Sequence, residues 1–147
     1  MMNKQRKAFS LIMAIVVIVL MATVAMLIMT ISGKMVKTTT TQYQKEQAVL
    51  YAKSYTEYAI MAVMANDRNT TTCLDNINAT IDNYTIRTVI SYIGNSDVSS
   101  CTNVISNSVV TSASPLNIMV DVFVSYPDPD HPNDLNMTYH RRSLQKI

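Results

Sequence analysis

Residues 8–32 read AFSLIMAIVVIVLMATVAMLIMTIS and contain no charged side chain. Between Ala8 and Ile31, only the hydroxyl groups of Ser10, Thr23 and Thr30 interrupt the apolar residues, and Ser32 ends the run. A helix needs roughly 20 such residues to cross the hydrocarbon of a bilayer. The stretch therefore predicts a membrane-spanning helix close to the N-terminus.

Basic residues precede this stretch. Lys4, Arg6 and Lys7 come before it without any acid, which favours a cytoplasmic N-terminus and an external remainder. Lys34 and Lys37 favour the opposite orientation. Without the first three cations the formal net charge falls from +2 to −1. The charge of the whole chain thus gives no support to a nucleic-acid partner.

The helical pattern continues beyond the span, because no proline occurs before Pro115. Gly33 is the one helix breaker, and a single glycine costs a helix about 1 kcal/mol. A helix from Phe9 to Met64 would be on the order of 84 Å long at about 1.5 Å per residue. The β-branched run Thr38–Thr41 predicts a frayed or bent segment, and Asn66 with Asp67 predicts the helix end.

The segment from Gln42 to Met64 is amphipathic. Small and aromatic residues recur in it at spacings of three and four, which gives one helix face a stripe that needs covering. We interpret the stripe as packing within the chain rather than as a contact between subunits. Its members are Ala48, Ala52, Tyr55, Ala59 and Ala62.

After residue 65 the composition shifts to Asn, Ser and Thr, and the apolar period shifts towards two. This pattern predicts strands over 84–93 and 116–126, a turn over 127–134 that leads into a weaker strand over 135–139, and a further strand within 103–111. We expect an α+β fold, in which a long N-terminal helix packs its second half against a small antiparallel sheet. The expected domains are a leader (1–8), a transmembrane half (9–32), an amphipathic half (33–65) and a β-rich head (66–147).

Cys73 and Cys101 both follow the span, on the side expected to be periplasmic. An oxidising compartment would pair them. The bond would close a loop of about 28 residues and stabilise the head by roughly 3–4 kcal/mol. A redox role for two free thiols would call for closer spacing, and pairing between chains is the remaining alternative.

The junction KAFSLI at residues 7–12 resembles the prepilin cleavage and methylation motif of the type IV pilin-like family. The resemblance implies cleavage by a prepilin peptidase between Ala8 and Phe9, followed by N-methylation of Phe9. Ala8 stands where glycine is usual. No site typical of a secretory signal peptidase follows Ile31.

The resemblance also implies the partners and the assembly surface. Expected partners are other pilin or pseudopilin subunits, the prepilin peptidase, the inner-membrane assembly platform and the lipid bilayer, but no nucleic acid. The expected role is that of a non-enzymatic subunit, processed in the bacterial inner membrane and assembled into a pilus or pseudopilus. The residues expected in the membrane and then in the filament core are Ser10, Leu11, Ile12, Met13, Ile15, Val16, Val19 and Leu20.

Two positions depart from the family pattern. Met13 stands where the family usually has a glutamate that neutralises the terminal amine of a neighbouring subunit, and Thr30 stands where many pilins have proline. We therefore expect a minor pilin or a type II secretion pseudopilin rather than a major subunit. A membrane-anchored periplasmic binding module that never assembles is the alternative.

Three other features have modest interpretations. Asp128, Asp130 and Asp134, near His131, offer oxygen ligands for calcium, although a solvated turn suits them better and no cofactor is expected. His131 and His140 belong to no catalytic pattern, so we expect no enzyme. The basic segment 139–142 resembles a DNA-contacting patch less than a solvated strand end.

Overall fold

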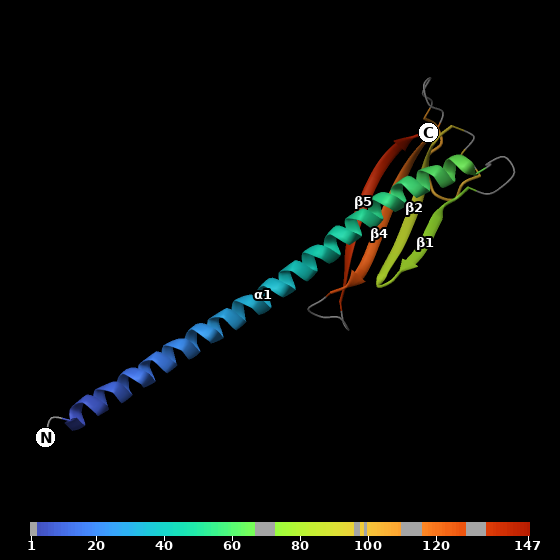
Figure 1. Ribbon diagram of the computed structural model, residues 1–147. Coiled ribbons are helices and arrows are strands. Elements are labelled where there is room, and N and C mark those ends of the chain that lie inside the picture. The colour runs from blue at the N-terminus through green and yellow to red at the C-terminus, as the bar shows by residue number, and fades with distance from the viewer. Residues whose placement is uncertain (1–2, 67–72, 96–97, 99, 110–115, 129–134) are drawn as a thin grey trace. The chain divides into compact units, whose positions relative to one another are not determined.

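A computed structural model describes residues 3–66, 73–95, 98, 100–109, 116–128 and 135–147, with residues 3–9 described as helix backbone only. Within these residues the chain forms one helix followed by five strands, and Figure 1 shows their arrangement. These elements are α1 (Asn3–Ala65), β1 (Asn76–Ile81), β2 (Tyr84–Gly94), β3 (Val104–Ser106), β4 (Leu116–Pro127) and β5 (Asn136–Lys146).

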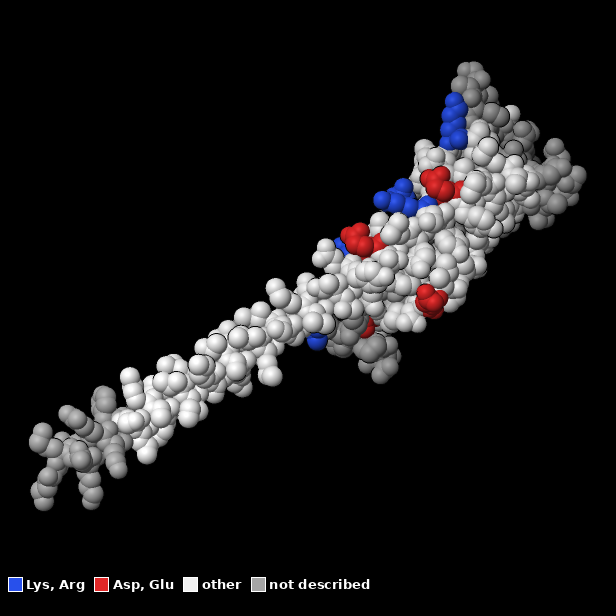
Figure 2. Space-filling model, viewed as in Figure 1, with Lys and Arg blue, Asp and Glu red and all other residues white. Residues whose placement is uncertain are grey.

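The chain divides into two compact units, Met1–Thr40 and Thr41–Ile147. The first unit is helical, and every side chain that the structure describes between residues 10 and 40 is exposed. Figure 2 shows the apolar stretch of this helix as a length without charged atoms on the face in view. By length and composition, α1 is able to cross a membrane.

The second unit contains the sheet, with strand order β1-β2-β4-β5. β2 pairs antiparallel with β4 from Thr85↔Ser125 to Gly94↔Leu116. β4 then pairs antiparallel with β5 along the whole of β5, from Pro127↔Asn136 to Asn117↔Lys146. The predicted strands over 84–93 and 116–126 are thus confirmed, as is the hairpin that joins β4 to the last strand.

The core of this unit lies between α1 and one face of the sheet, which α1 crosses in Figure 1. On α1, Ala48, Ala52 and Ala59 are completely buried, as the predicted stripe required. Their small side chains let the helix backbone approach the sheet closely. The α+β fold is therefore confirmed. Thr56 and Val63 on α1 also belong to this core, and the sheet contributes Ile86, Thr88, Ile90, Tyr92, Ile118, Val120, Val122 and Val124.

The structure differs from the predictions in three strands. β1 was not predicted, because it is short and contains Asn, which is depleted in strands. β3 lies within the predicted 103–111 segment, but it pairs parallel to β2 rather than antiparallel. The Tyr92 amide donates to the carbonyl of Asn103 beside this pair, at 2.8 Å. β5 continues to Lys146, beyond the predicted end at residue 139.

Of the two possibilities predicted for Thr38–Thr41, fraying is wrong, because α1 is continuous there, and a bend stays a prediction. The hydroxyls of Thr38, Thr39 and Thr40 donate to the carbonyls four residues earlier, at 2.9–3.0 Å. These bonds satisfy the hydroxyls without leaving the helix. The helix ends at Ala65, as predicted, and the Asn66 amide donates to the carbonyl of Ala62.

Candidate functional site

The most extensive candidate site is the apolar surface of α1 in the first unit. All seven apolar residues predicted for the membrane and filament contacts are between 47% and 64% exposed. These side chains point in every direction around the helix, so the helix has no polar face that could be turned towards water. This surface needs an apolar host, either lipid or other helices. The residues are Leu11, Ile12, Met13, Ile15, Val16, Val19 and Leu20, and Ser10 at the start of the stretch is also exposed.

The few hydroxyl groups inside this stretch are satisfied by the helix itself. Thr23 donates to the carbonyl of Leu20 at 2.8 Å, and Thr30 donates to the carbonyl of Met26 at 2.6 Å. A polar group that is bonded internally enters hydrocarbon at much lower cost than a free one. The stretch is thus compatible with a lipid host despite its threonines.

The predicted cleavage junction lies at the start of α1. Ala8 and Phe9 are part of the helix backbone, while their side chains are outside the described part of the chain. Cleavage and N-methylation therefore stay predictions. Met13, four residues further on, presents a thioether and is 58% exposed.

The predicted disulfide between Cys73 and Cys101 is confirmed. Their Cα atoms are 5.0 Å apart, and both residues are buried. Cys73 precedes β1 and Cys101 precedes β3, so the bond ties the start of the sheet to the segment that follows β2. It stabilises a head that is rich in small polar side chains.

The aspartates considered as weak calcium ligands belong to the turn between β4 and β5. Asp128 donates its amide to the carbonyl of Leu135 at 3.0 Å, which closes the base of this turn. Asp130, His131 and Asp134 lie outside the described residues. Within the described ranges, no three His, Cys, Asp or Glu residues are grouped as metal ligands.

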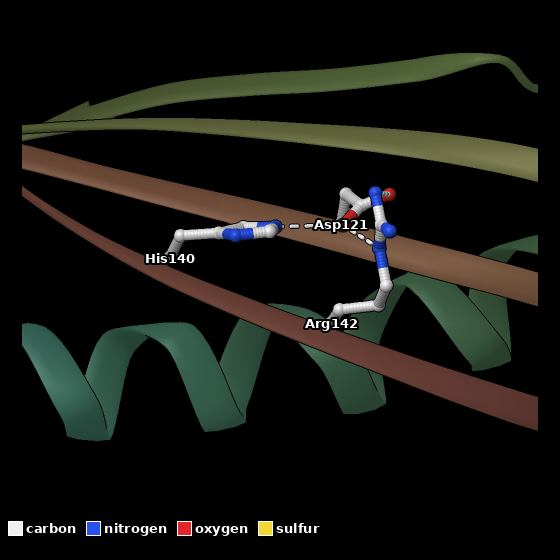
Figure 3. Close-up of polar contacts among 3 residues, drawn as sticks. All are labelled: Asp121, His140 and Arg142. Carbon is white, nitrogen blue, oxygen red and sulfur yellow. Dashed lines mark hydrogen bonds and ion pairs between the residues drawn. The ribbon is translucent and has the colours of Figure 1, made fainter.

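A polar cluster that the sequence analysis missed lies on the sheet face opposite α1. Asp121 on β4 is 7% exposed and accepts three hydrogen bonds from β5 (Figure 3). His140 donates from Nε2 to Oδ1 at 2.7 Å. Arg142 donates from Nε to Oδ1 at 2.7 Å and from Nη2 to Oδ2 at 3.1 Å. These bonds compensate for burial of the carboxylate.

Opposing effects act on the Asp121 carboxyl group. Burial alone would raise its pKa, but the hydrogen bonds and positive charges of Arg142 and His140 outweigh burial and lower the pKa of Asp121 below its ordinary value. The carboxylate is therefore charged at neutral pH and fixes the His140 ring.

His140 also ends a stack that crosses three strands. The Arg87 guanidinium lies 4.9 Å from the centre of the Phe123 ring, and Phe123 stacks on His140 at 4.4 Å between ring centres. The strand register explains the stack, because Arg87 pairs with Phe123 and Phe123 pairs with His140.

His140 lies on β5 with 41% of its side chain exposed. Its partner Asp121 was not singled out by the sequence analysis. The basic segment 139–142 gave part of the signal. The rest needed the register of β4 against β5, which places Asp121 directly opposite Arg142.

Together these features define a class of protein, one with a potential membrane span in the described part of the chain and a disulfide-stabilised α+β head. Comparison with protein-family models, with curated proteins and with solved structures finds no match.

Proposed function

We propose that the chain is a structural subunit, a minor pilin or pseudopilin, of a type IV pilus or a type II secretion pseudopilus. The observation that supports this most is the continuity of α1. An apolar stretch that is exposed on all sides continues without a break into a segment that buries an alanine stripe against the sheet. The sheet covers the second half of this helix, whereas the first half needs a separate apolar environment.

In the proposed mechanism, the apolar half of α1 first holds the subunit in the bacterial inner membrane. Lys4, Arg6 and Lys7 keep the N-terminus in the cytoplasm, and the head lies in the periplasm. The prepilin peptidase then cleaves before Phe9, which is N-methylated. Extraction exchanges lipid contacts for contacts with sister helices, and because both surroundings are similarly apolar, the assembly platform must drive this step.

Met13 favours a minor or specialised position. The amine of Phe9 would be a positive charge in an apolar filament core, and such a charge is costly without a partner. The described side chains between residues 10 and 33 include no carboxylate that could neutralise it. A subunit that is placed where this neutralisation is not needed fits the sequence better than one repeated along the whole filament.

Mass spectrometry of the protein purified from its native cells tests the proposal. We expect a chain that begins at N-methylated Phe9. Ala8→Leu, which places a bulky residue at the cut, should leave the leader attached, whereas the matched variant Ala14→Leu should be processed normally. A wild-type chain that still begins at Met1 or Met2 would contradict processing.

The filament role has its own test, since a processed protein could still remain a membrane anchor. Processed protein should co-fractionate with sheared surface or periplasmic fibres. If it is found only in the inner membrane, the non-assembling binding module is the better account. Deleting the gene and scoring exoprotein release, twitching and transformation would then identify the system that it serves.

A further inference from the structure

The long free edge of the sheet is strand β5. β4 pairs with it over its full length of 11 residues, and among the strands that the structure describes no other one pairs with β5. It lies at the margin of the sheet in Figure 1. The opposite margin is divided between β1, which has 6 residues, and β3, which has 3. An unpaired edge presents a row of backbone donors and acceptors that can accept another strand.

The side chains of this edge select for negative charge. β5 carries His140, Arg141, Arg142 and Lys146 and contains no acid. Residues 41–147 as a whole contain more acids than Lys and Arg residues, so the cations of β5 stand out against a head of opposite net charge. Charged edges repel ordinary strands, and a purely cationic edge repels an acidic strand least.

Two details suggest where a ligand would bind. The Nε of Arg141 is buried and has no hydrogen-bond partner, and it lies on the face that α1 covers. On the other face, the stack Arg87–Phe123–His140 ends at β5, so the side of the His140 ring away from Phe123 meets no described ring. Arg142 beside it is 61% exposed even though it contacts Asp121.

We propose that the β5 edge binds an extended acidic segment of another protein by strand addition. Residues opposite each other on paired strands share a face. An antiparallel partner would therefore present one acid to Arg142, a second acid to Arg141 on the other face, and an aromatic ring to His140. The recognised sequence is acid, acid, aromatic, held by backbone hydrogen bonds along β5. This inference does not depend on cleavage at Phe9 or on filament assembly.

The probe is the synthetic peptide Thr-Val-Thr-Glu-Glu-Phe-Thr-Val-Thr, of about the length of an ordinary strand. Its binding to the full chain in detergent micelles is measured by fluorescence anisotropy. Three matched peptides serve as controls. One has Lys-Lys in place of Glu-Glu, one has a central proline, and one carries N-methyl groups on alternate backbone amides. We expect each control to bind at least about tenfold more weakly.

Hydrogen exchange then locates the peptide. The amides of β5 should gain protection when it binds, whereas those of β1 should not change. Arg141→Gln should weaken binding by about tenfold, while Lys53→Gln, which removes a charge from the exposed side of α1, should leave it unchanged. Absence of binding by the acidic peptide, equal binding of the N-methylated or lysine peptide, or protection at β1 would each overturn the proposal, whatever the variants do.

Discussion

The two halves of α1 are both rich in apolar residues but differ in how these residues are arranged. Leu20 in the first half is 59% exposed and Leu50 in the second half is 56% exposed, so exposure alone does not separate them. Leu20 is surrounded by apolar residues on every side of the helix. Leu50 lies opposite a buried alanine stripe and near the charged residues Lys53 and Glu57. The arrangement of apolar residues around the helix, rather than their number, indicates which surroundings each half requires.

Removal of the disulfide should produce the largest difference between the two regions. In the double variant Cys73→Ser, Cys101→Ser, we expect the head to lose roughly 3–4 kcal/mol of unfolding free energy, because the unfolded chain is no longer constrained. Membrane association of the first half should persist. Urea denaturation followed by tyrosine fluorescence measures the first effect and carbonate extraction the second. An unchanged urea midpoint, or loss of the protein from membranes, would contradict this difference.

A charge in each half should have different effects at equal exposure. Leu20→Asp should reduce membrane insertion, because a carboxylate near the middle of a spanning helix costs about 3 kcal/mol. Leu50→Asp, its matched control, should insert normally and change head stability by no more than about 0.5 kcal/mol. The membrane fraction of each variant is compared with wild type. Equal membrane fractions for the two variants would contradict the claim that the first half of α1, and not the second, lies in lipid.

Enlarging an alanine should have the opposite pattern, with a larger effect in the second half of α1 than in the first. Ala52 is completely buried between α1 and the sheet, so Ala52→Leu should destabilise the head by about 1–3 kcal/mol. Ala22→Leu lies in the exposed apolar half and should leave the stability of the head unchanged. Thermal or urea denaturation of both variants provides the measurement. A neutral Ala52→Leu would show that the helix does not pack closely on the sheet.

Acid should weaken the sheet region through Asp121. The folded-state pKa of Asp121 is lowered, so its contribution to stability is present above its unfolded pKa of about 3.9 and is lost as the pH falls through the lower folded value. Asp121→Asn should cost about 1–2 kcal/mol at neutral pH and should reduce the loss of stability below about pH 4. Unfolding free energies measured between neutral and strongly acidic pH test this. An unaltered acid dependence in Asp121→Asn would assign it to other carboxyl groups.

The smallest effect is expected at Gly33, which lies where the two halves of α1 meet. A methyl group at Gly33 would meet no atom within 4 Å, so Gly33→Ala should cause no steric strain. It should stabilise the local helix by up to about 1 kcal/mol. Hydrogen exchange should slow around residue 33, with no change in membrane fraction or in head stability. Faster exchange in this segment would contradict a continuous helix.

The sequence was sufficient for the elements that have strong periodic signals. An uncharged apolar run, an alanine stripe and two alternating strands each have one good structural solution, and the structure contains all of them. β1 was missed because it is short and because Asn76 and Asn78 lower its strand propensity, although its apolar residues alternate. The parallel pairing of β3 was missed because pairing direction depends on the path of the chain rather than on local pattern. The predicted fraying failed because the threonine hydroxyls bond back to the helix.

The candidate sites were predictable only where a single pair of residues was enough. Cys73 and Cys101 could be paired from their number and their expected compartment. The cluster around Asp121 could not be predicted, because it depends on the register between two strands that the turn alone did not determine. Cleavage before Phe9 depends on recognition by a peptidase outside the chain, so it stays a prediction.

The difference between the two halves of α1 can be measured directly with single cysteines. Leu20→Cys and Leu50→Cys are treated with a membrane-impermeant maleimide in native membranes opened to the periplasmic side, with Cys73–Cys101 oxidised. We expect the cysteine at position 50 to react and the cysteine at position 20 to react only after detergent or urea disrupts its surroundings. Rapid labelling at both positions in intact membranes would contradict the assignment of the first half to an apolar host.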